Sequence, residues 1–131
     1  MLVAWCRALT GRLRLLRYKG GGDALEVTKA KNDLMAAIEV FEERNVAWTE
    51  EVDPGEVVAN YAVALKWGGQ VQTAKDAIAR TLARLPVENV VSRRQLDVAS
   101  ALVAGQSLDA SLQWFDERGF TRRVALWRRL A

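Results

Sequence analysis

Carboxylates are the residues of this chain best suited to chemistry, and they gather in its middle. The stretch from residue 39 to residue 56 holds seven acidic side chains: Glu39, Glu42, Glu43, Glu50, Glu51, Asp53 and Glu56. Two carboxylates held in a pocket can serve as general acid and general base when their surroundings shift one pKa. A solvated acidic face needs no pocket, and we favour that interpretation, ahead of a docking surface for a basic partner.

Other catalytic and metal-binding residue types are scarce. The chain has no histidine, and Cys6 is its only cysteine. A single cysteine forms no internal disulfide, and without histidine neither the common zinc ligand sets nor a nucleophile–histidine pair can be built. The glycine run at 20–22 lacks the Lys-Ser/Thr that completes a phosphate-binding loop. We therefore expect a protein that is not an enzyme and that uses no cofactor or metal.

The net charge of +3 is distributed unevenly along the chain. Residues 1–22 carry five basic side chains and no acid, and residues 121–131 carry four and no acid. All sixteen acids lie between Asp23 and Glu117. Basic ends of this kind either contact an anionic partner or fold back onto the acidic middle, and the sequence leaves both alternatives open.

Twelve residues are candidates for binding a partner. Most are arginines of the two ends, joined by one carboxylate, one lysine and two tryptophans. They are Arg7, Arg12, Arg14, Arg17, Glu56, Lys66, Trp67, Arg122, Arg123, Trp127, Arg128 and Arg129. An exposed tryptophan beside arginines suits an RNA or protein contact, although burial in the core is the commoner role for each tryptophan here.

These side chains must be positioned by helices, because apolar residues recur at helical spacing along most of the chain. Caps, glycines and prolines divide it into about seven helices, near residues 2–18, 23–44, 54–67, 72–85, 93–104, 108–118 and 121–130. The Asp-Pro-Gly-Glu motif at 53–56 is the clearest helix start, with Asp53 as the cap and proline at the first helical position. Ser92, Ser107 and Thr121 are expected to cap three later helices.

One phrase occurs three times along these helices. It reads LMAAIEVFEER at 34–44, AKDAIARTLAR at 74–84 and LDASLQWFDER at 108–118, and the closing arginines lie 40 and 34 residues apart. A helical phrase of this period is typical of stacked helical hairpins, and the alternative is a helical bundle without a repeat. We expect the apolar members of the phrase to be buried: Ala37, Ile38, Phe41, Ala77, Ile78, Leu112 and Phe115.

Residues 57–86 resemble a tetratricopeptide repeat and, less closely, a pentatricopeptide repeat. The residues that match the family pattern are Val58, Tyr61, Ala62, Leu65, Gly69, Ala74, Ile78 and Pro86. Two positions depart from it, because Ala62 stands where glycine is usual and Thr81 where alanine is usual. Residues 92–121 repeat the pattern more weakly, and the Phe-Glu-Glu and Phe-Asp-Glu endings at 41–43 and 115–117 lean toward the pentatricopeptide style. The resemblance implies an all-α protein, a short α-solenoid of about three helical hairpins and about seven helices.

We expect a single domain over residues 1–131, with a basic N-terminal helix at 1–19, a repeat body at 23–118 and a basic C-terminal helix at 121–131. A repeat array needs terminal helices that cover its apolar faces. The two basic helices are therefore expected to point four leucines inward, namely Leu9, Leu13, Leu126 and Leu130. Four arginines are then expected to stay free for a partner, namely Arg12, Arg14, Arg122 and Arg129.

A helical array of this kind typically holds another macromolecule. We expect a non-enzymatic scaffold or accessory subunit of a larger macromolecular assembly that binds protein partners. The alternative is an RNA-contacting component of an organellar ribonucleoprotein, such as a ribosomal or pentatricopeptide-like protein, whose basic ends contact phosphates. Residues 1–19 are amphipathic, basic and free of acids, which favours a mitochondrial location over the cytoplasm. No apolar run approaches the roughly 20 residues that a membrane span requires, so none is expected.

Overall fold

The computed structural model describes residues 2–43 and 53–131, and these residues form seven α-helices and no strand. The helices are α1 (Leu2–Lys19), α2 (Leu25–Glu43), α3 (Pro54–Trp67), α4 (Val71–Arg84), α5 (Val90–Val103), α6 (Asp109–Glu117) and α7 (Thr121–Leu130). Each expected helix is present, and the all-α prediction is confirmed. Arg44, which closes the first copy of the repeated phrase, and the carboxylates Glu50 and Glu51 lie outside the described residues.

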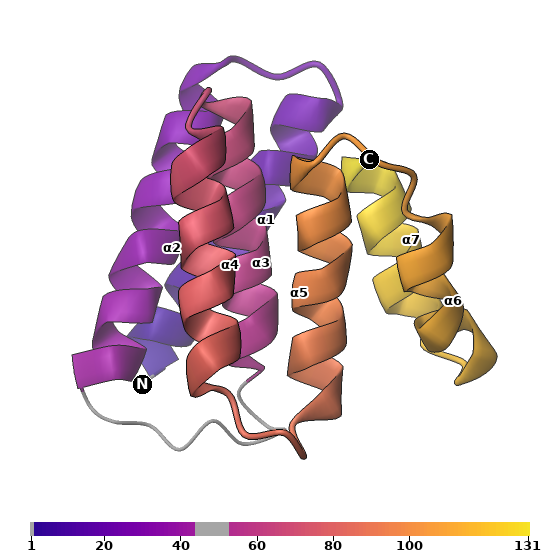
Figure 1. The fold of residues 1–131 in the computed structure, drawn as a ribbon. Coiled ribbons are helices and arrows are strands. Elements are labelled where there is room, and N and C mark those ends of the chain that lie inside the picture. Colours follow the sequence, from indigo (N-terminus) through magenta and orange to yellow (C-terminus); the bar gives the residue numbers. More distant parts are fainter. Residues whose placement is uncertain (1, 44–52) are drawn as a thin grey trace.

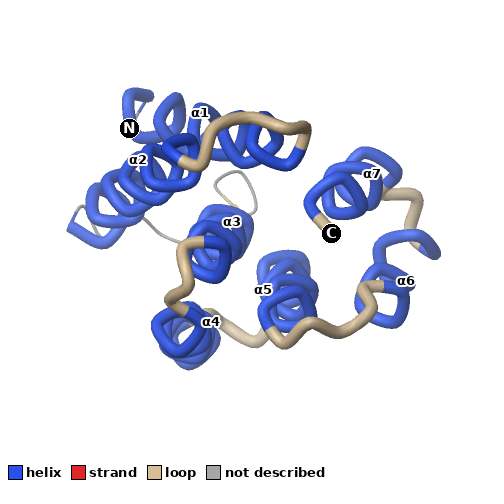
Figure 2. The backbone as a smooth tube through the Cα atoms, turned by 90° about the horizontal axis from the view of Figure 1, so that it is seen from above, coloured by secondary structure: helices blue, strands red, loops and turns tan. Residues whose placement is uncertain are grey.

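Helices that follow one another in the chain pack side by side, as expected for a short helical array (Figure 1). Seen from above, α1, α3, α5 and α7 line the inside of a curve, and α2, α4 and α6 lie on its outside (Figure 2). Helix α3 occupies the centre, in contact with α1, α2, α4 and α5. The curve brings α7 back against α1, so the two basic ends of the chain become neighbours.

Helices α3 and α4 form the antiparallel hairpin that the sequence predicts over residues 57–86 (Figure 1). At its start, the backbone N–H of Glu56 donates to Asp53 Oδ1 at 3.1 Å, which confirms Asp53 as the cap. At the turn, Gly69 has a φ of +81°, a left-handed conformation that glycine adopts without strain. Turn chemistry readable from the sequence therefore sets the bounds of this hairpin.

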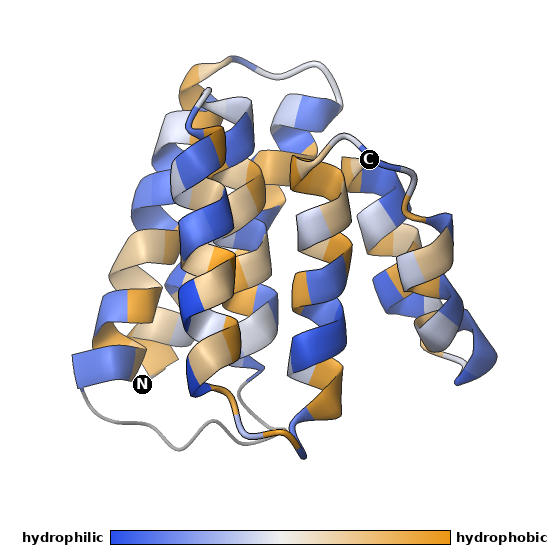
Figure 3. Ribbon diagram, in the orientation of Figure 1, coloured by the Kyte–Doolittle hydropathy of each residue, from blue (hydrophilic) through white to orange (hydrophobic). Residues whose placement is uncertain are grey.

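The repeated phrase marks the buried faces of the outer helices α2, α4 and α6. Its first position is buried in every copy, at Leu34, Ala74 and Leu108, and so is its eighth, at Phe41, Thr81 and Phe115. Of the seven residues expected in the core, six are buried. The seventh, Ile38, is only half-buried, because α2 turns its smaller neighbour Ala37 toward the packed side. Figure 3 shows the contrast between the largely apolar α3 and the outer helices, which mix apolar with hydrophilic residues.

The caps expected for the three later helices are wrong, since the cap positions are Asn89, Leu108 and Phe120. Helix α5 begins at Val90, and Ser92 lies inside its first turn, where its hydroxyl donates to Asp53 Oδ1 at 2.6 Å. Thr121 is the first residue of α7 rather than its cap. The cap position of α6 is Leu108, one residue after Ser107, although the Ser107 hydroxyl accepts a hydrogen bond from the backbone N–H of Asp109 at 3.2 Å and so satisfies a free N–H group at the start of α6.

Helix α1 belongs to the packed body. Its buried residues are Ala4, Ala8, Gly11 and Leu15, and small residues at three of these four positions let α2 approach closely. A Cβ atom at Gly11 would lie 2.7 Å from Leu34 Cγ of α2. None of the described helices is both long and apolar enough to cross a membrane.

Candidate partner-binding surface

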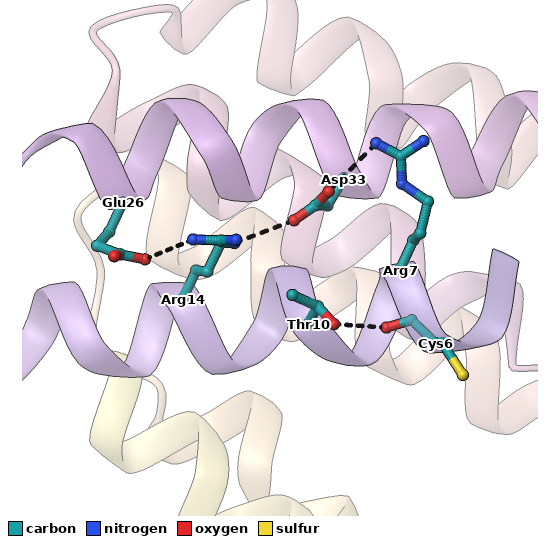
Figure 4. Close-up of polar contacts among 6 residues, drawn as sticks. All are labelled: Cys6, Arg7, Thr10, Arg14, Glu26 and Asp33. Carbon is teal, nitrogen blue, oxygen red and sulfur yellow. Dashed lines mark hydrogen bonds and ion pairs between the residues drawn. The ribbon is translucent and has the colours of Figure 1, made fainter. Parts of the chain in front are cut away.

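Arginines of α1 that face α2 are held in ion pairs, which Figure 4 shows side by side. Arg14 lies between two carboxylates, with Nη1 3.2 Å from Glu26 Oε2 and Nε 3.1 Å from Asp33 Oδ2. Arg7 Nη2 is 3.3 Å from the other oxygen of Asp33. Partly exposed pairs of this kind each contribute about 1 kcal/mol or less, yet together they fix the position of α1 along α2. The expectation that Arg14 stays free is therefore wrong.

Two further arginines of the chain ends turn into the curve of inner helices. Arg12 of α1 forms an ion pair with Glu56 of α3. Arg123 of α7 lies with Nη2 3.6 Å from Oδ2 of the buried Asp53, whose other oxygen accepts from Ser92. The expectation of a free Arg12 is wrong, because these pairs tie the N-terminal and C-terminal helices to the centre of the array. A third pair, Arg128–Asp109 at 3.0 Å, lies in solvent.

Trp127 is part of the core and is not an exposed contact residue. Only 4% of its surface is exposed, and its indole Nε1–H donates to Gln95 Oε1 of α5 at 2.6 Å. Gln95 is itself buried, so each group satisfies the other in an environment where an unpaired polar atom is costly. A partner could reach Trp127 only after α7 left the array.

Burial is the main influence on the carboxyl group of Glu56. It raises the pKa of Glu56 above the ordinary value of 4.5, and the charge of Asp53 acts in the same direction, while Arg12 and Arg123 oppose it. A raised pKa in the folded protein means that the folded protein binds this proton more tightly than the unfolded chain does. Ionising Glu56 therefore costs stability.

We expect the pH dependence of stability to reveal this cost. As the pH rises above about 4.5 and through the folded-state pKa, the wild-type protein should lose stability relative to the variant Glu56→Gln, which cannot ionise. Urea unfolding of both proteins at a series of pH values measures the difference in their free energies of unfolding. Parallel pH curves for the two proteins would contradict the raised pKa.

The C-terminal ends of the four inner helices meet around a cavity of about 260 Å³. Lys66 Nζ donates to the backbone carbonyl of Leu102 at 2.6 Å, which places a positive charge at the negative end of α5. Trp67 lines this cavity, and its ring centroid is 5.4 Å from that of Tyr18. Of the candidates Lys66 and Trp67, the first thus holds the array together and the second borders an open space.

An apolar stripe on α1 faces away from the array. Leu2, Leu9 and Leu13 are 76%, 45% and 53% exposed, and Cys6 between them is exposed as well. The expectation that Leu9 and Leu13 point inward is wrong. The small residues of α1 occupy the packed side instead. This leaves Leu2 and Leu13 on the outer side and Leu9 at its edge, where Leu9 also lines a small cavity with Glu56 and Val57 of α3.

A basic ridge on α7 runs beside this stripe. Leu126 of α7 and Arg12 of α1 line the same small cavity, so this side of α7 adjoins α1. Arg122 and Arg129 lie four residues before and three residues after Leu126, on the same side of the helix. Leu126 is half-buried, whereas both arginines are exposed. Leu130, in contrast, points inward as expected and is 2% exposed.

Three candidate arginines remain without an ion pair within the described part of the chain, namely Arg17, Arg122 and Arg129. Arg17 lies on the outer side of α1, four residues after Leu13. We define the outer face of α1/α7 as the stripe Leu2, Cys6, Leu9 and Leu13 together with Arg17, Arg122 and Arg129. On this face, exposed apolar area lies beside arginines that form no ion pair within the described residues.

The leucines of this face cannot be recognised as exposed from the size of the apolar residues of α1, because most of the larger ones lie on the exposed side and the small ones on the packed side. The spacing of Ala4, Ala8, Gly11 and Leu15 is equally helical. Small residues at such spacing are the sign of close helix–helix contact, and they could have identified the packed side.

Comparison of the chain with protein-family models, with curated proteins and with solved structures finds no match.

Proposed function

We propose that this protein is a non-enzymatic scaffold or accessory subunit of a larger assembly, built as a tetratricopeptide-like helical array, and that it binds protein partners. The observation that carries the proposal is the outer face of α1/α7. Leu2, Leu9 and Leu13 are large apolar residues held in water on a well-packed helix, and contiguous exposed apolar surface of this kind is typical of interaction sites.

The arrangement of the helices supports the same function. A repeat array is stable through contacts between neighbouring hairpins, so the solvent-exposed sides of its end helices α1 and α7 can carry partner-binding residues without loss of the fold. In this chain the inner polar residues are largely used by the protein itself, through the pairs of Arg12 with Glu56 and of Trp127 with Gln95. A partner therefore finds unpaired charged groups on the outer face of α1/α7.

RNA binding through the basic ends is the competing function. Five of the nine basic residues of the ends form ion pairs with acids of the described residues: Arg7, Arg12, Arg14, Arg123 and Arg128. The partly buried Trp114 has Arg118 at 4.3 Å and Arg94 at 5.4 Å from its ring centroid, so two guanidinium groups compete with a base for stacking on this ring. Both observations favour protein over RNA.

Isolation of the full-length protein from its native cells tests the proposal. We expect it to elute from a sizing column within a larger assembly, together with defined protein partners, and nuclease treatment should leave that assembly intact. A free monomer under mild conditions, or an assembly that nuclease dissolves, would overturn the proposal.

A further inference from the structure

The apolar stripe of α1 has the spacing of a coiled-coil seam. Leu2, Cys6, Leu9, Leu13 and Leu16 follow one another at intervals of 4, 3, 4 and 3 residues. This alternation keeps apolar side chains on the side of a helix that faces a partner helix. With a rise of 1.5 Å per residue, the stripe is about 21 Å long, which is enough for two heptads of contact. Leu16 is half-buried, so the end of the stripe leans toward the array.

Both flanks of this seam are positively charged. Arg17 directly follows Leu16 and lies on one flank, and Arg122 and Arg129 of α7 lie on the other. Neither α1 nor α7 contains an acidic residue. Acidic side chains on a partner helix would therefore meet three arginines that form no ion pair within the described residues, without a repulsive contact from α1 or α7.

The same charges argue against a second copy of this chain. Two copies joined through α1 would bring Arg17, Arg122 and Arg129 of each copy toward the basic surface of the other, and like charges at the flanks of a seam disfavour pairing. The narrow seam also differs from the wide apolar face of a helix that lies in a lipid surface, because Ala4, Ala8, Gly11 and Leu15 are used inside the protein.

We propose that the outer face of α1/α7 receives an amphipathic helix of another protein, with apolar residues in a 4-3 repeat and acidic residues on both flanks. The inference rests on the proposed function and names the kind of partner. The partner helix packs its apolar residues between Leu9 and Leu13, and its carboxylates pair with Arg17 on one side and with Arg122 and Arg129 on the other.

A synthetic helix tests this proposal with the full-length protein. The probe is a fluorescent peptide of about three heptads with leucine at both seam positions and glutamate at both flanking positions. Its own glutamates repel one another, which keeps the peptide from pairing with itself. We expect saturable binding by fluorescence anisotropy that weakens as salt is raised, because the flanking ion pairs are screened.

Matched variants assign the binding to this face. Leu13→Glu should weaken it by about tenfold or more, because it places an unpaired charge in the seam. Leu25→Glu is the control, since Leu25 is also 53% exposed but lies on α2. The double reversal Arg122→Glu with Arg129→Glu should weaken binding by about tenfold, whereas Arg80→Glu on the exposed side of α4 should not. Circular dichroism of each variant serves to check that it remains helical.

Four results would overturn the proposal. One is the absence of saturable binding by the acidic peptide. Another is equal binding by a peptide with lysine in place of every glutamate. The third concerns vesicles of anionic phospholipid. If the wild-type protein binds these vesicles, Leu13→Glu does not, and the wild-type protein fails to bind the peptide, the face binds a lipid surface and not a helix. An assembly with protein partners that persists in Leu13→Glu would also refute this docking site, but it would leave the proposed function standing.

Discussion

Replacement of Ile78 by aspartate is expected to lower the free energy of unfolding by about 4 kcal/mol, which is among the largest effects of a single substitution. Ile78 lies in the second copy of the repeated phrase, is 4% exposed and belongs to the core where α4 packs on α3 and α5. The substitution removes a large apolar side chain and buries a carboxylate that has no partner there. Urea unfolding followed by circular dichroism measures the loss.

The neighbouring position provides the control for this prediction. Ala79 follows Ile78 on α4 but is exposed, so Ala79→Asp should cost about 0.5 kcal/mol through helix propensity alone. Equal stability of the two variants would show that Ile78 is not in the packed interface between hairpins. It would also remove the physical basis for reading the phrase as a repeat.

The second large effect is expected at Gly55 of α3, which lies directly against the backbone of Ser92 in α5. A Cβ atom at this position would lie 2.6 Å from Ser92 Cα and would also overlap the backbone carbonyl of Ser92. Backbone atoms cannot rotate away as a side chain can, so Gly55→Ala must push the two helices apart. We expect a loss of about 3 kcal/mol, as for overpacking of a dense core.

Gly68→Ala is the matched control for the substitution at Gly55. Gly68 has a φ of −83°, and a Cβ atom there would meet its nearest neighbour, the carbonyl oxygen of Ala64, at an ordinary 3.4 Å. Thermal unfolding should therefore show a change of less than about 1 kcal/mol for Gly68→Ala. A Gly55→Ala protein as stable as this control would mean that α3 and α5 are not packed as described.

Much of the fold could be predicted because the signals are local. The motif at 53–56 marks the start of α3 by its cap and its proline, and Gly69 marks the turn that follows. These features act within a few residues, so they can be read without knowledge of the rest of the chain. The burial of Phe41, Ile78 and Phe115 follows from a phrase that occurs three times.

The predictions that fail are those in which a residue far away in the sequence determines the contacts of a side chain. Serine is a common helix cap, but the hydroxyl of Ser92 donates its hydrogen bond to Asp53, which lies 39 residues away in the sequence. Trp127 stands among arginines in the sequence, yet it is buried, and Gln95 of α5 accepts the hydrogen bond of its indole N–H. Neither partner can be identified from local spacing.

The candidate site could be predicted only in part, for the same reason. From the sequence, the basic ends either contact an anionic partner or fold back onto the acidic middle. In the structure, some of their arginines pair with acids of the middle and others do not. Arg14 pairs with Glu26 and Asp33, whereas Arg17, Arg122 and Arg129 form no ion pair within the described residues. Whether a given arginine reaches an acidic residue or stays exposed depends on how α1 and α7 are rotated about their axes. Packing against the other helices sets that rotation.

Photo-crosslinking in native cells tests most directly whether the outer face of α1/α7 binds a protein partner. A photoreactive amino acid is placed at Leu13 in one protein and at Leu25 in another, two positions that are equally exposed at 53%. We predict a defined protein adduct from position 13, with crosslinked peptides that show apolar residues in a 4-3 repeat between acidic flanks, and no such adduct from position 25. Equal labelling at both positions, or an RNA adduct at position 13, would contradict the assignment.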